Sequence, residues 1–316
     1  MQLHRRIFTS FKLKGRTLEL AICADSSWNR WHPSYEALGD RCKRNGIAAL
    51  ELAYYPENKD FESASEILSS YGVRVVSVNA TSKLRINVLE DPRAAQDQLI
   101  QCINLADSFG AKYVVMYPGT RPHWNFVDQI NNFKRRMDPV FSVAVEKGIT
   151  LLLENHFDLR GEDPLHRDVV REPDRTAVFF SAIDCPNLKL NFDAGNVYIA
   201  GIEPWPYAYR ILKEFIVYAH FKDATRYSEE LHGSIESNEL LSDKSAGIFL
   251  PVAVGEGGIN YAGLLREMSL NANIQFGAFE DHTSADRAEG YYDRGISYLR
   301  SVMTIGSNQS ELEPRH

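Results

Sequence analysis

One local pattern recurs along this chain: a polar, helix-like stretch, then a glycine, then a short apolar run. Glycine is favoured just after a helix, because the backbone there adopts a left-handed conformation that a Cβ disfavours. The apolar runs are rich in Val, Ile, Leu and Tyr, which is typical of strands buried on both faces of a parallel sheet. The pattern occurs as NGIAALEL (Gly46), YGVRVVSV (Gly72), FGAKYVVM (Gly110) and KGITLLLE (Gly148).

The repetition predicts an α/β fold, a (β/α)8 TIM barrel that forms a single domain over residues 1–316. Eight strand–helix units joined by right-handed crossovers close into such a barrel. The clearest helix is expected at 92–109, where Pro92 suits a first helical position. Outside the repeats we expect an N-terminal arm (1–16), a flexible tail (306–316) and an enlarged loop after strand seven (223–258) without clear periodicity. The eight strands are predicted at 17–24, 47–54, 73–79, 111–117, 149–156, 187–194, 215–222 and 274–281.

Bulk composition excludes several classes of protein. The net charge of −7 argues against a nucleic-acid binder, which needs a concentrated basic surface. No apolar stretch approaches the roughly 20 residues of a membrane span. The four cysteines are scattered without a Cys-x-x-Cys motif, which indicates reduced thiols and a cytoplasmic location. The basic segment before Glu19 could also mark an organelle transit peptide, but a solvated arm is favoured because it lacks an amphipathic period.

The apolar runs in the last two-thirds of the chain stop at side chains that bind metals. An acid that ends a buried strand is costly unless it is paired or binds a cation. The carboxyl ends of parallel strands meet at one mouth of a barrel, so these side chains predict a single divalent-metal site. The runs are LLLENH, LKLNFDAGN, VYAHFKD and FGAFEDH, and the candidate ligands are Glu154, Asp193, His220 and Glu280.

Each candidate ligand has an ordinary explanation when it is taken alone. Glu154 or Asp193 could cap the next helix, and a lone His220 is more often a hydrogen-bonded core histidine. Lys222 could form a weak ion pair with Asp223 at the rim. Four ligands on successive strand ends favour the metal site over these explanations. A mixed set of oxygen and nitrogen ligands suits Mn²⁺ first, with Mg²⁺, Co²⁺ and Zn²⁺ as alternatives.

Strand alternation adds three groups to the predicted mouth of the barrel. Residues two apart on a strand face the same way. His156 therefore lies on the face of Glu154, Lys222 on that of His220, and His282 on that of Glu280. Trp28 and His123, which follow strands one and four, could wall a sugar pocket, although plain packing explains them equally well.

These strings resemble the xylose-isomerase-like TIM-barrel superfamily of sugar (phosphate) isomerases and epimerases over roughly residues 17–300. The resemblance rests on LLLEN, DAGN, HFKD, GEGGINY and AFED. It implies that Glu154, Asp193, His220 and Glu280 are the metal ligands and that the two glutamates exchange protons with the substrate. Many epimerases carry a histidine three residues after the metal aspartate, where this chain has Asn196. Arg226 matches an arginine that often grips the substrate, although it begins the long connection.

The favoured function is a metal-dependent isomerase or epimerase of a keto-sugar or related polyol. It removes the proton α to a carbonyl through a metal-stabilised enediolate. Glu154, Glu280 and His156 are the expected catalytic residues, and the expected substrate contacts are Asn196, Lys222, Arg226, Trp28 and His123. The expected partner is a small carbohydrate rather than nucleic acid or a membrane, with a homo-oligomer or a small partner subunit left open.

Three alternatives use the same barrel. A lyase, either a dehydratase or a deglycosidase of a keto-glycoside, shares the α-proton step and then loses a β-substituent, with His156 as an additional base. An abasic-site endonuclease needs further histidines after strands two and three, where this chain has SVNATS after strand three. A non-catalytic sugar-binding barrel would bind metal without exchanging substrate protons.

Overall fold

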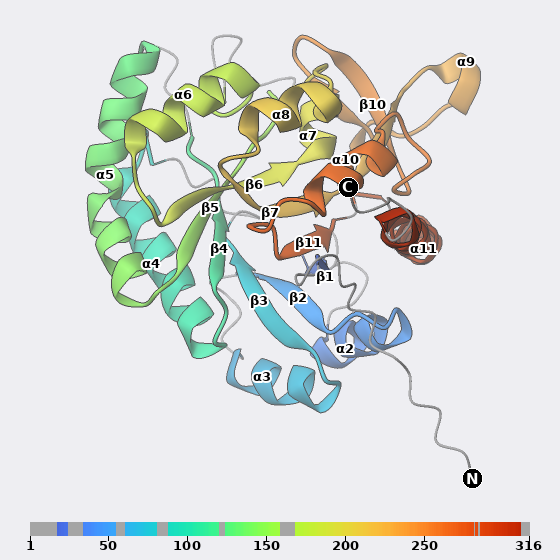
Figure 1. Ribbon diagram of the computed structural model, residues 1–316, viewed down its shortest axis with the longest axis horizontal. Coiled ribbons are helices and arrows are strands. Elements are labelled where there is room, and N and C mark those ends of the chain that lie inside the picture. The colour runs from blue at the N-terminus through green and yellow to red at the C-terminus, as the bar shows by residue number, and fades with distance from the viewer. Residues whose placement is uncertain are drawn as a thin grey trace, which may run out of the picture.

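Eight parallel strands of the chain close into a barrel surrounded by helices (Figure 1). The computed structural model describes residues 18–24, 34–54, 61–80, 88–119, 124–158, 168–280, 282–283 and 285–310. Each strand pairs with its neighbours in chain order, and β1 pairs with the last strand to complete the closure. The barrel strands are β1 (Glu19–Ala24), β2 (Ala49–Ala53), β3 (Arg74–Asn79), β4 (Tyr113–Met116), β5 (Thr150–Glu154), β6 (Leu188–Asp193), β7 (Ile216–Phe221) and β11 (Phe276–Phe279).

All eight strands lie within the ranges predicted from the sequence, and the predicted barrel is confirmed. The expected helix at 92–109 is α4, which begins at Pro92 and ends at Ser108. Gly46, Gly72, Gly110 and Gly148 all have positive φ, so the glycines do end helices. The helices around the barrel are α2 (Tyr35–Arg44), α3 (Phe61–Ser70), α4, α5 (Phe126–Glu146), α6 (Pro173–Ile183), α7 (Ala194–Ile199), α8 (Tyr209–Leu212), preceded by the π-type turn Pro204–Ala208, α10 (Tyr261–Met268) and α11 (Ala285–Ser310).

The predicted loop after strand seven is an antiparallel sheet rather than an irregular segment. Its strands are β8 (Asp223–Arg226), β9 (Leu241–Asp243) and β10 (Gly247–Val252), in the order β8-β10-β9. The short helix α9 (Glu229–His232) and a 3-10 turn (Ser237–Glu239) lie between β8 and β9. Figure 1 shows this small sheet beside the barrel, near α10 and α11. Two of these strands, β8 (DATR) and β9 (LSD), lack the continuous apolar run that marks the barrel strands, which explains why the sheet was not predicted.

A buried ion-pair network joins the small sheet to the segment that follows β5. The Arg171 guanidinium lies 3.1 Å from Asp243 Oδ1 on β9 and 3.2 Å from Asp158 Oδ2. The Asp158 backbone N–H donates to Asp243 Oδ2, and Arg171 also donates to the carbonyl of Ala200. The network therefore holds three segments that are distant in sequence against one another.

The interior of the barrel is apolar in one layer and polar at the carboxyl ends of the strands. One layer is apolar and contains a buried group of inward-facing residues packed together: Ala21, Cys23, Ala49, Val76, Tyr113, Val115, Leu152, Tyr218 and Ala278. Buried acids and His220 lie at the carboxyl ends of the strands. A TIM barrel offers its strand ends and βα loops to ligands at that end, so the polar groups lie where a functional site is expected.

The end of the chain differs in part from the prediction. Helix α11 extends to Ser310, so residues 306–310 of the expected tail are helical. The predicted arm at 1–16 and residues 311–316 lie outside the described residues. Among the helices that the structure describes, none combines the length and the apolar character that a membrane span requires.

Replacing Asp243 tests the ion-pair network. We expect Asp243→Ala to lower the free energy of unfolding by about 3 kcal/mol, because it leaves the buried Arg171 charge with one partner fewer. Chemical denaturation followed by circular dichroism measures the change. The control is Glu172→Gln. Glu172 also pairs with Arg171, at 2.9 Å, but its side chain is 40% exposed, so its loss should cost less than about 1 kcal/mol. Equal effects of the two substitutions would contradict the proposed role of Asp243.

Candidate metal centre and active site

Four predicted ligands meet at the carboxyl end of the barrel. Each of Glu154, Asp193, His220 and Glu280 offers one ligand atom, and these atoms all lie within 4.8 Å of one another. Glu154 ends β5, Asp193 ends β6, His220 lies near the end of β7, and Glu280 directly follows β11. Their side chains are nearly inaccessible, with exposed fractions of 1%, 0%, 0% and 6% in that order. The topology therefore brings together residues from four strands.

The imidazole of His220 turns one nitrogen toward the three acids. Its Nδ1 lies 3.5 Å from Glu154 Oε1, 3.4 Å from Glu280 Oε2 and 3.9 Å from Asp193 Oδ2. Nδ1 and Glu154 Oε2 are buried and have no hydrogen-bond partner among the described residues. Buried polar atoms without partners are uncommon and call for an explanation such as a bound ion. Oxygen and imidazole nitrogen donors suit Mn²⁺, Mg²⁺, Co²⁺ or Zn²⁺, so the donor set fits a divalent metal.

Two asparagines hold the acids in place. Asn155 exchanges two hydrogen bonds with the Asp193 backbone, at 2.8 and 2.9 Å, and so ties β5 to β6. Asn196 donates its side-chain amide to Glu154 Oε1 at 2.9 Å and to the Asn155 carbonyl at 2.9 Å. The Asn196 backbone N–H donates to Asp193 Oδ1 at 2.8 Å, so Asp193 also caps α7. The helix-cap explanation considered for Asp193 is therefore correct and is compatible with a ligand role for its second oxygen.

Lys222 lies inside the cluster. Its Nζ is 2.7 Å from Asp193 Oδ2 and 2.8 Å from Glu280 Oε2. A Cβ at Gly195 would overlap the Lys222 side chain, so the glycine of the DAGN string makes room for this lysine. The Tyr261 hydroxyl donates to the Lys222 carbonyl at 2.6 Å and holds the backbone. Lys222 thus supplies positive charge between two of the buried carboxylates.

Asp223, next to Lys222, does not form the rim ion pair considered from the sequence. Its Oδ2 accepts hydrogen bonds from the backbone N–H groups of Gly255 and Gly257, at 3.0 and 3.2 Å. Gly255 has a φ of +95°, and a Cβ at Gly257 would overlap Asp223. The GEGG string is therefore a turn that wraps the Asp223 carboxylate before α10 begins.

Alternation predicts two further histidines, His156 and His282, on the face of the ligands, and the structure places His282 in contact with the cluster. His282 Nε2 lies 3.2 Å from Glu280 Oε1 and 3.3 Å from Lys222 Nζ. His156 donates Nδ1–H to the Phe157 carbonyl at 2.7 Å and stacks on the Phe157 ring. Burial and the positive charge of Lys222 lower the pKa of His156 to about 4, so it is neutral at physiological pH. This value lies well below the pKa of about 6.5 of an ordinary histidine.

The other predicted substrate contacts have different outcomes. The Asn196 amide already donates both of its hydrogen bonds to Glu154 and Asn155, which makes it an orienting group. Arg226 lies on the small sheet, where it bonds the Ala246 carbonyl and covers the Phe249 ring, so the structure does not bring it into the cluster. Trp28 and His123 lie outside the described residues.

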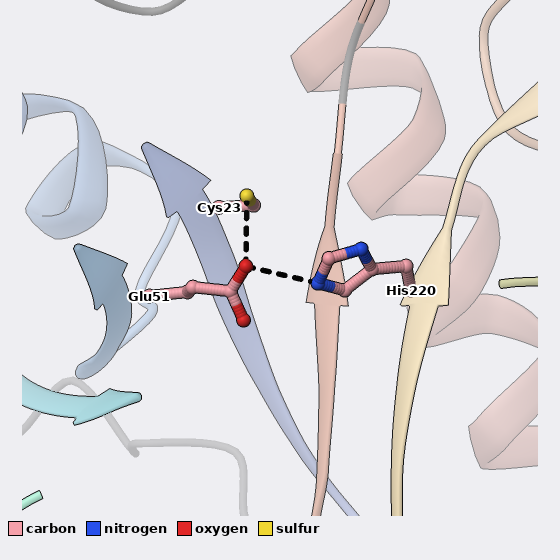
Figure 2. A group of neighbouring side chains, drawn as sticks. All are labelled: Cys23, Glu51 and His220. Atoms are coloured by element: carbon pink, nitrogen blue, oxygen red, sulfur yellow. Dashed lines mark hydrogen bonds and ion pairs between the residues drawn. The ribbon is translucent and has the colours of Figure 1, made fainter. Parts of the chain in front are cut away.

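Sequence reasoning missed Glu51, a fully buried glutamate on β2. Its Oε1 lies 3.0 Å from His220 Nε2, on the side of the imidazole ring away from the other acids, and 3.1 Å from Cys23 Sγ (Figure 2). Glu51 stands in the apolar run IAALEL. The same argument that marked Glu154, an acid in a buried strand, could have marked Glu51. It was overlooked because Glu51 does not end its run.

The acids and the cations of the cluster shift one another's pKa values. Burial opposes ionisation of Glu280, but Lys222, His282 and His220 together hold its pKa well below the usual range. Burial raises the pKa of Asp193 to about 7; Lys222 counteracts the shift, whereas Glu280 adds to it. Burial disfavours the protonated form of His220, yet the charges of Glu51, Glu154 and Glu280 raise its pKa well above 6.5. The cluster therefore attracts positive charge strongly.

The fold and the ligand cluster define a TIM barrel with a candidate divalent-metal centre at the carboxyl ends of its strands. The chain belongs to the Xylose isomerase-like TIM barrel family, which matches residues 39–302, and the resemblance seen in the sequence is confirmed. A search among curated proteins found no match.

Solved structures with the same fold include enzymes of two reaction types. The probable 3-DHS dehydratase AsbF from Bacillus anthracis has a TM-score of 0.67 at 18% identity, over 90% of this chain and 99% of its own. L-ribulose 3-epimerase has a TM-score of 0.67 at 15% identity, over 95% and 99%. The IOLI protein, solved with a zinc atom, has a TM-score of 0.64 at 13% identity, over 92% and 99%. At these identities the similarity establishes the fold alone.

Metal affinity should rise with pH. His220 must give up its Nδ1 proton to bind an ion, and its raised pKa means that this proton is present at neutral pH. The dissociation constant for Mn²⁺ should therefore fall by up to about tenfold per pH unit between about pH 6 and pH 8. Titration against a competing chelator measures it. Asp193→Ala, which removes a ligand, is the control and should bind far more weakly throughout. A dissociation constant that does not change over this range would contradict the assignment of Nδ1.

Proposed function

We propose that the protein is a divalent-metal-dependent isomerase or epimerase of a keto-sugar or related polyol. The observation that supports this most strongly is the convergence of four ligand atoms within 4.8 Å at the carboxyl ends of four barrel strands. Glu154, Asp193, His220 and Glu280 would hold the ion, with Mn²⁺ as the first choice. Family membership agrees with a carbohydrate substrate, and the epimerase among the solved relatives has the same fold.

The chemistry needs an acid–base pair beside an electrophile. A bound divalent ion acts as a Lewis acid and stabilises the negative charge that develops on a carbonyl oxygen when the α-proton leaves. Glu154 has one oxygen held by Asn196 and a second without a partner, so it is positioned to accept a proton. Glu280 contacts Lys222 and His282, which can supply a proton or positive charge. In this proposal one glutamate removes the proton and the other returns it.

Elimination is the second candidate, and His156 is the observation that favours it. Because its Nδ1 carries the proton that bonds the Phe157 carbonyl, the other ring nitrogen keeps its lone pair. The charges of Lys222, Asp193 and Glu280 all influence the pKa of His156, which supports a role for the ring beside the cluster. A neutral base there could assist departure of a β-substituent after the α-proton is lost. The probable dehydratase among the solved structures has the same fold, which supports elimination as the second candidate.

Proton exchange with solvent tests the proposal. We expect the Mn²⁺-loaded protein in D2O to incorporate deuterium α to the carbonyl of at least one member of a panel of ketoses and 3-keto-glycosides. ¹H NMR, after removal of the paramagnetic ion, follows the exchange. An unchanged carbon skeleton supports isomerisation or epimerisation, whereas release of water or an aglycone identifies the elimination. Metal binding without any exchange across the panel would contradict both and leave a sugar-binding barrel.

Replacing Glu280 tests its role as a proton carrier. We expect Glu280→Gln to keep measurable metal affinity and to lose at least about 10²-fold in kcat, the usual contribution of a positioned acid or base. The matched control is Glu256→Gln. The Glu256 carboxylate lies on the GEGG turn and pairs with Arg294 at 2.5 Å, outside the ligand cluster. That variant should turn over at the wild-type rate. Near-normal turnover of Glu280→Gln with metal bound would limit Glu280 to a ligand role.

A further inference from the structure

The carboxylate of Glu51 accepts hydrogen bonds from several directions. Ser77 Oγ donates to Oε2 at 2.7 Å, and Asn79 Nδ2 donates to Oε1 at 2.8 Å. Cys23 Sγ and His220 Nε2 also lie within hydrogen-bond distance of Oε1, as Figure 2 shows for these two. Glu51, Ser77, Cys23, Asn79 and His220 are all buried. A carboxylate with partners on both oxygens cannot rotate without breaking buried hydrogen bonds.

Cys23, Glu51 and His220 could in principle form a second metal site, since their ligand atoms also lie close together. The hydrogen bonds favour a different explanation. Cys23, Asn79 and His220 all point donors at the same oxygen, Glu51 Oε1, so these atoms already satisfy one another. His220 Nδ1, in contrast, has no partner among the described residues. The atoms that call for a cation therefore lie on the Nδ1 side of the ring.

We propose that Glu51 is a positioning residue that holds the proton of His220 on Nε2 and so presents the Nδ1 lone pair to the metal. A neutral imidazole carries its proton on one nitrogen only, and the hydrogen bond made by that nitrogen decides which one. A carboxylate behind a metal-bound histidine also fixes the ring orientation and raises the basicity of the ligand nitrogen. The inference rests on the metal site of the proposed function and assigns it a residue outside the ligand set.

The surroundings of Glu51 extend this support to two further strands. Cys23 belongs to β1, whereas Ser77 and Asn79 both belong to β3. Ser77 Oγ also lies 3.3 Å from the hydroxyl of Tyr218, which stands two residues before His220 on β7. The orientation of His220 is thus set by β3 and by β1 and β2, which lie across the barrel from β5 and β6, the strands that carry Glu154 and Asp193. A metal ligand on β7 depends in this way on β1, β2 and β3.

Glu51→Gln is the decisive variant, because glutamine keeps the size and one acceptor oxygen but removes the charge. We expect the wild-type protein to bind one Zn²⁺ per chain and Glu51→Gln to bind it about tenfold to 100-fold more weakly, the usual effect of changing such a partner. Zn²⁺ is the probe because it is diamagnetic. Chelator competition gives the dissociation constant. Glu256→Gln, which removes the charge of a glutamate that pairs with Arg294 on the GEGG turn outside the cluster, is the matched control and should stay within about threefold of wild type.

A spectroscopic measurement separates positioning from a purely structural role. In ¹⁵N-histidine-labelled, zinc-loaded protein, the His220 ring should give an exchange-protected Nε2–H signal, assigned by its loss in His220→Gln. The signal should move upfield in Glu51→Gln, because a neutral acceptor bonds the proton more weakly. A change of Kd and of this signal, with an unchanged circular dichroism spectrum, supports the inference.

The outcomes distinguish this inference from the proposed function. Wild-type protein that binds no divalent ion overturns both. One bound ion, together with an unchanged Kd and an unchanged Nε2–H signal in Glu51→Gln, overturns the role of Glu51 and leaves the metal site intact. Two bound ions in wild type and one in Cys23→Ser would overturn it in favour of a second metal site at Cys23, Glu51 and His220.

Discussion

Four buried carboxylates at one end of the barrel require compensating positive charge from the groups around them. Glu51, Glu154, Asp193 and Glu280 are each at most 6% exposed. Negative charge buried without a partner costs several kcal/mol or forces protonation. Lys222 lies against Asp193 and Glu280, and His220 contacts all four acids, so these two groups supply part of the balancing charge. A divalent ion among the three acids on the Nδ1 side would supply the remainder.

The short sequence motifs around the acids hold the charged side chains of the cluster in position. In DAGN, Asp193 caps α7, Gly195 leaves room for Lys222, and Asn196 orients Glu154. In HFKD, His220 and Lys222 enter the cluster, while Asp223 binds the backbone of the GEGG turn. Each string therefore combines a group that faces the site with a group that fixes the local backbone. This division explains why residues of such different chemistry stand side by side in the sequence.

The barrel by itself does not select a reaction, because one fold accommodates many chemistries. Its solved relatives include an epimerase and a probable dehydratase at similar TM-scores. The difference between these reactions lies in what happens after an α-proton has left, and hence in the groups at the mouth. Here the candidate groups are His156, which is neutral at physiological pH, and His282, which contacts Lys222 and Glu280. They are the side chains through which the same metal centre could serve either reaction.

The sequence by itself determined the barrel and the four candidate ligands. Glycine in a left-handed conformation ends α2, α3, α4 and α5, buried parallel strands need continuous apolar runs, and an acid at the end of such a run is conspicuous. Alternation along a strand also predicted that Lys222 and His282 face the mouth with the ligands, and both contact Glu280. These features are local, so they can be seen without knowing which strands are adjacent.

Only the tertiary structure decided what depends on contacts between distant segments. The small sheet was not recognisable because β8 and β9 lack a continuous apolar run, and it is held by Arg171 from a different part of the chain. Arg226 was assigned by spacing from His220, but β8 carries it onto the small sheet. Glu51 and His220 are separated by 169 residues and meet only because the barrel closes. Local periodicity can therefore predict that a strand is buried, but which side chain it meets across the barrel is set by closure.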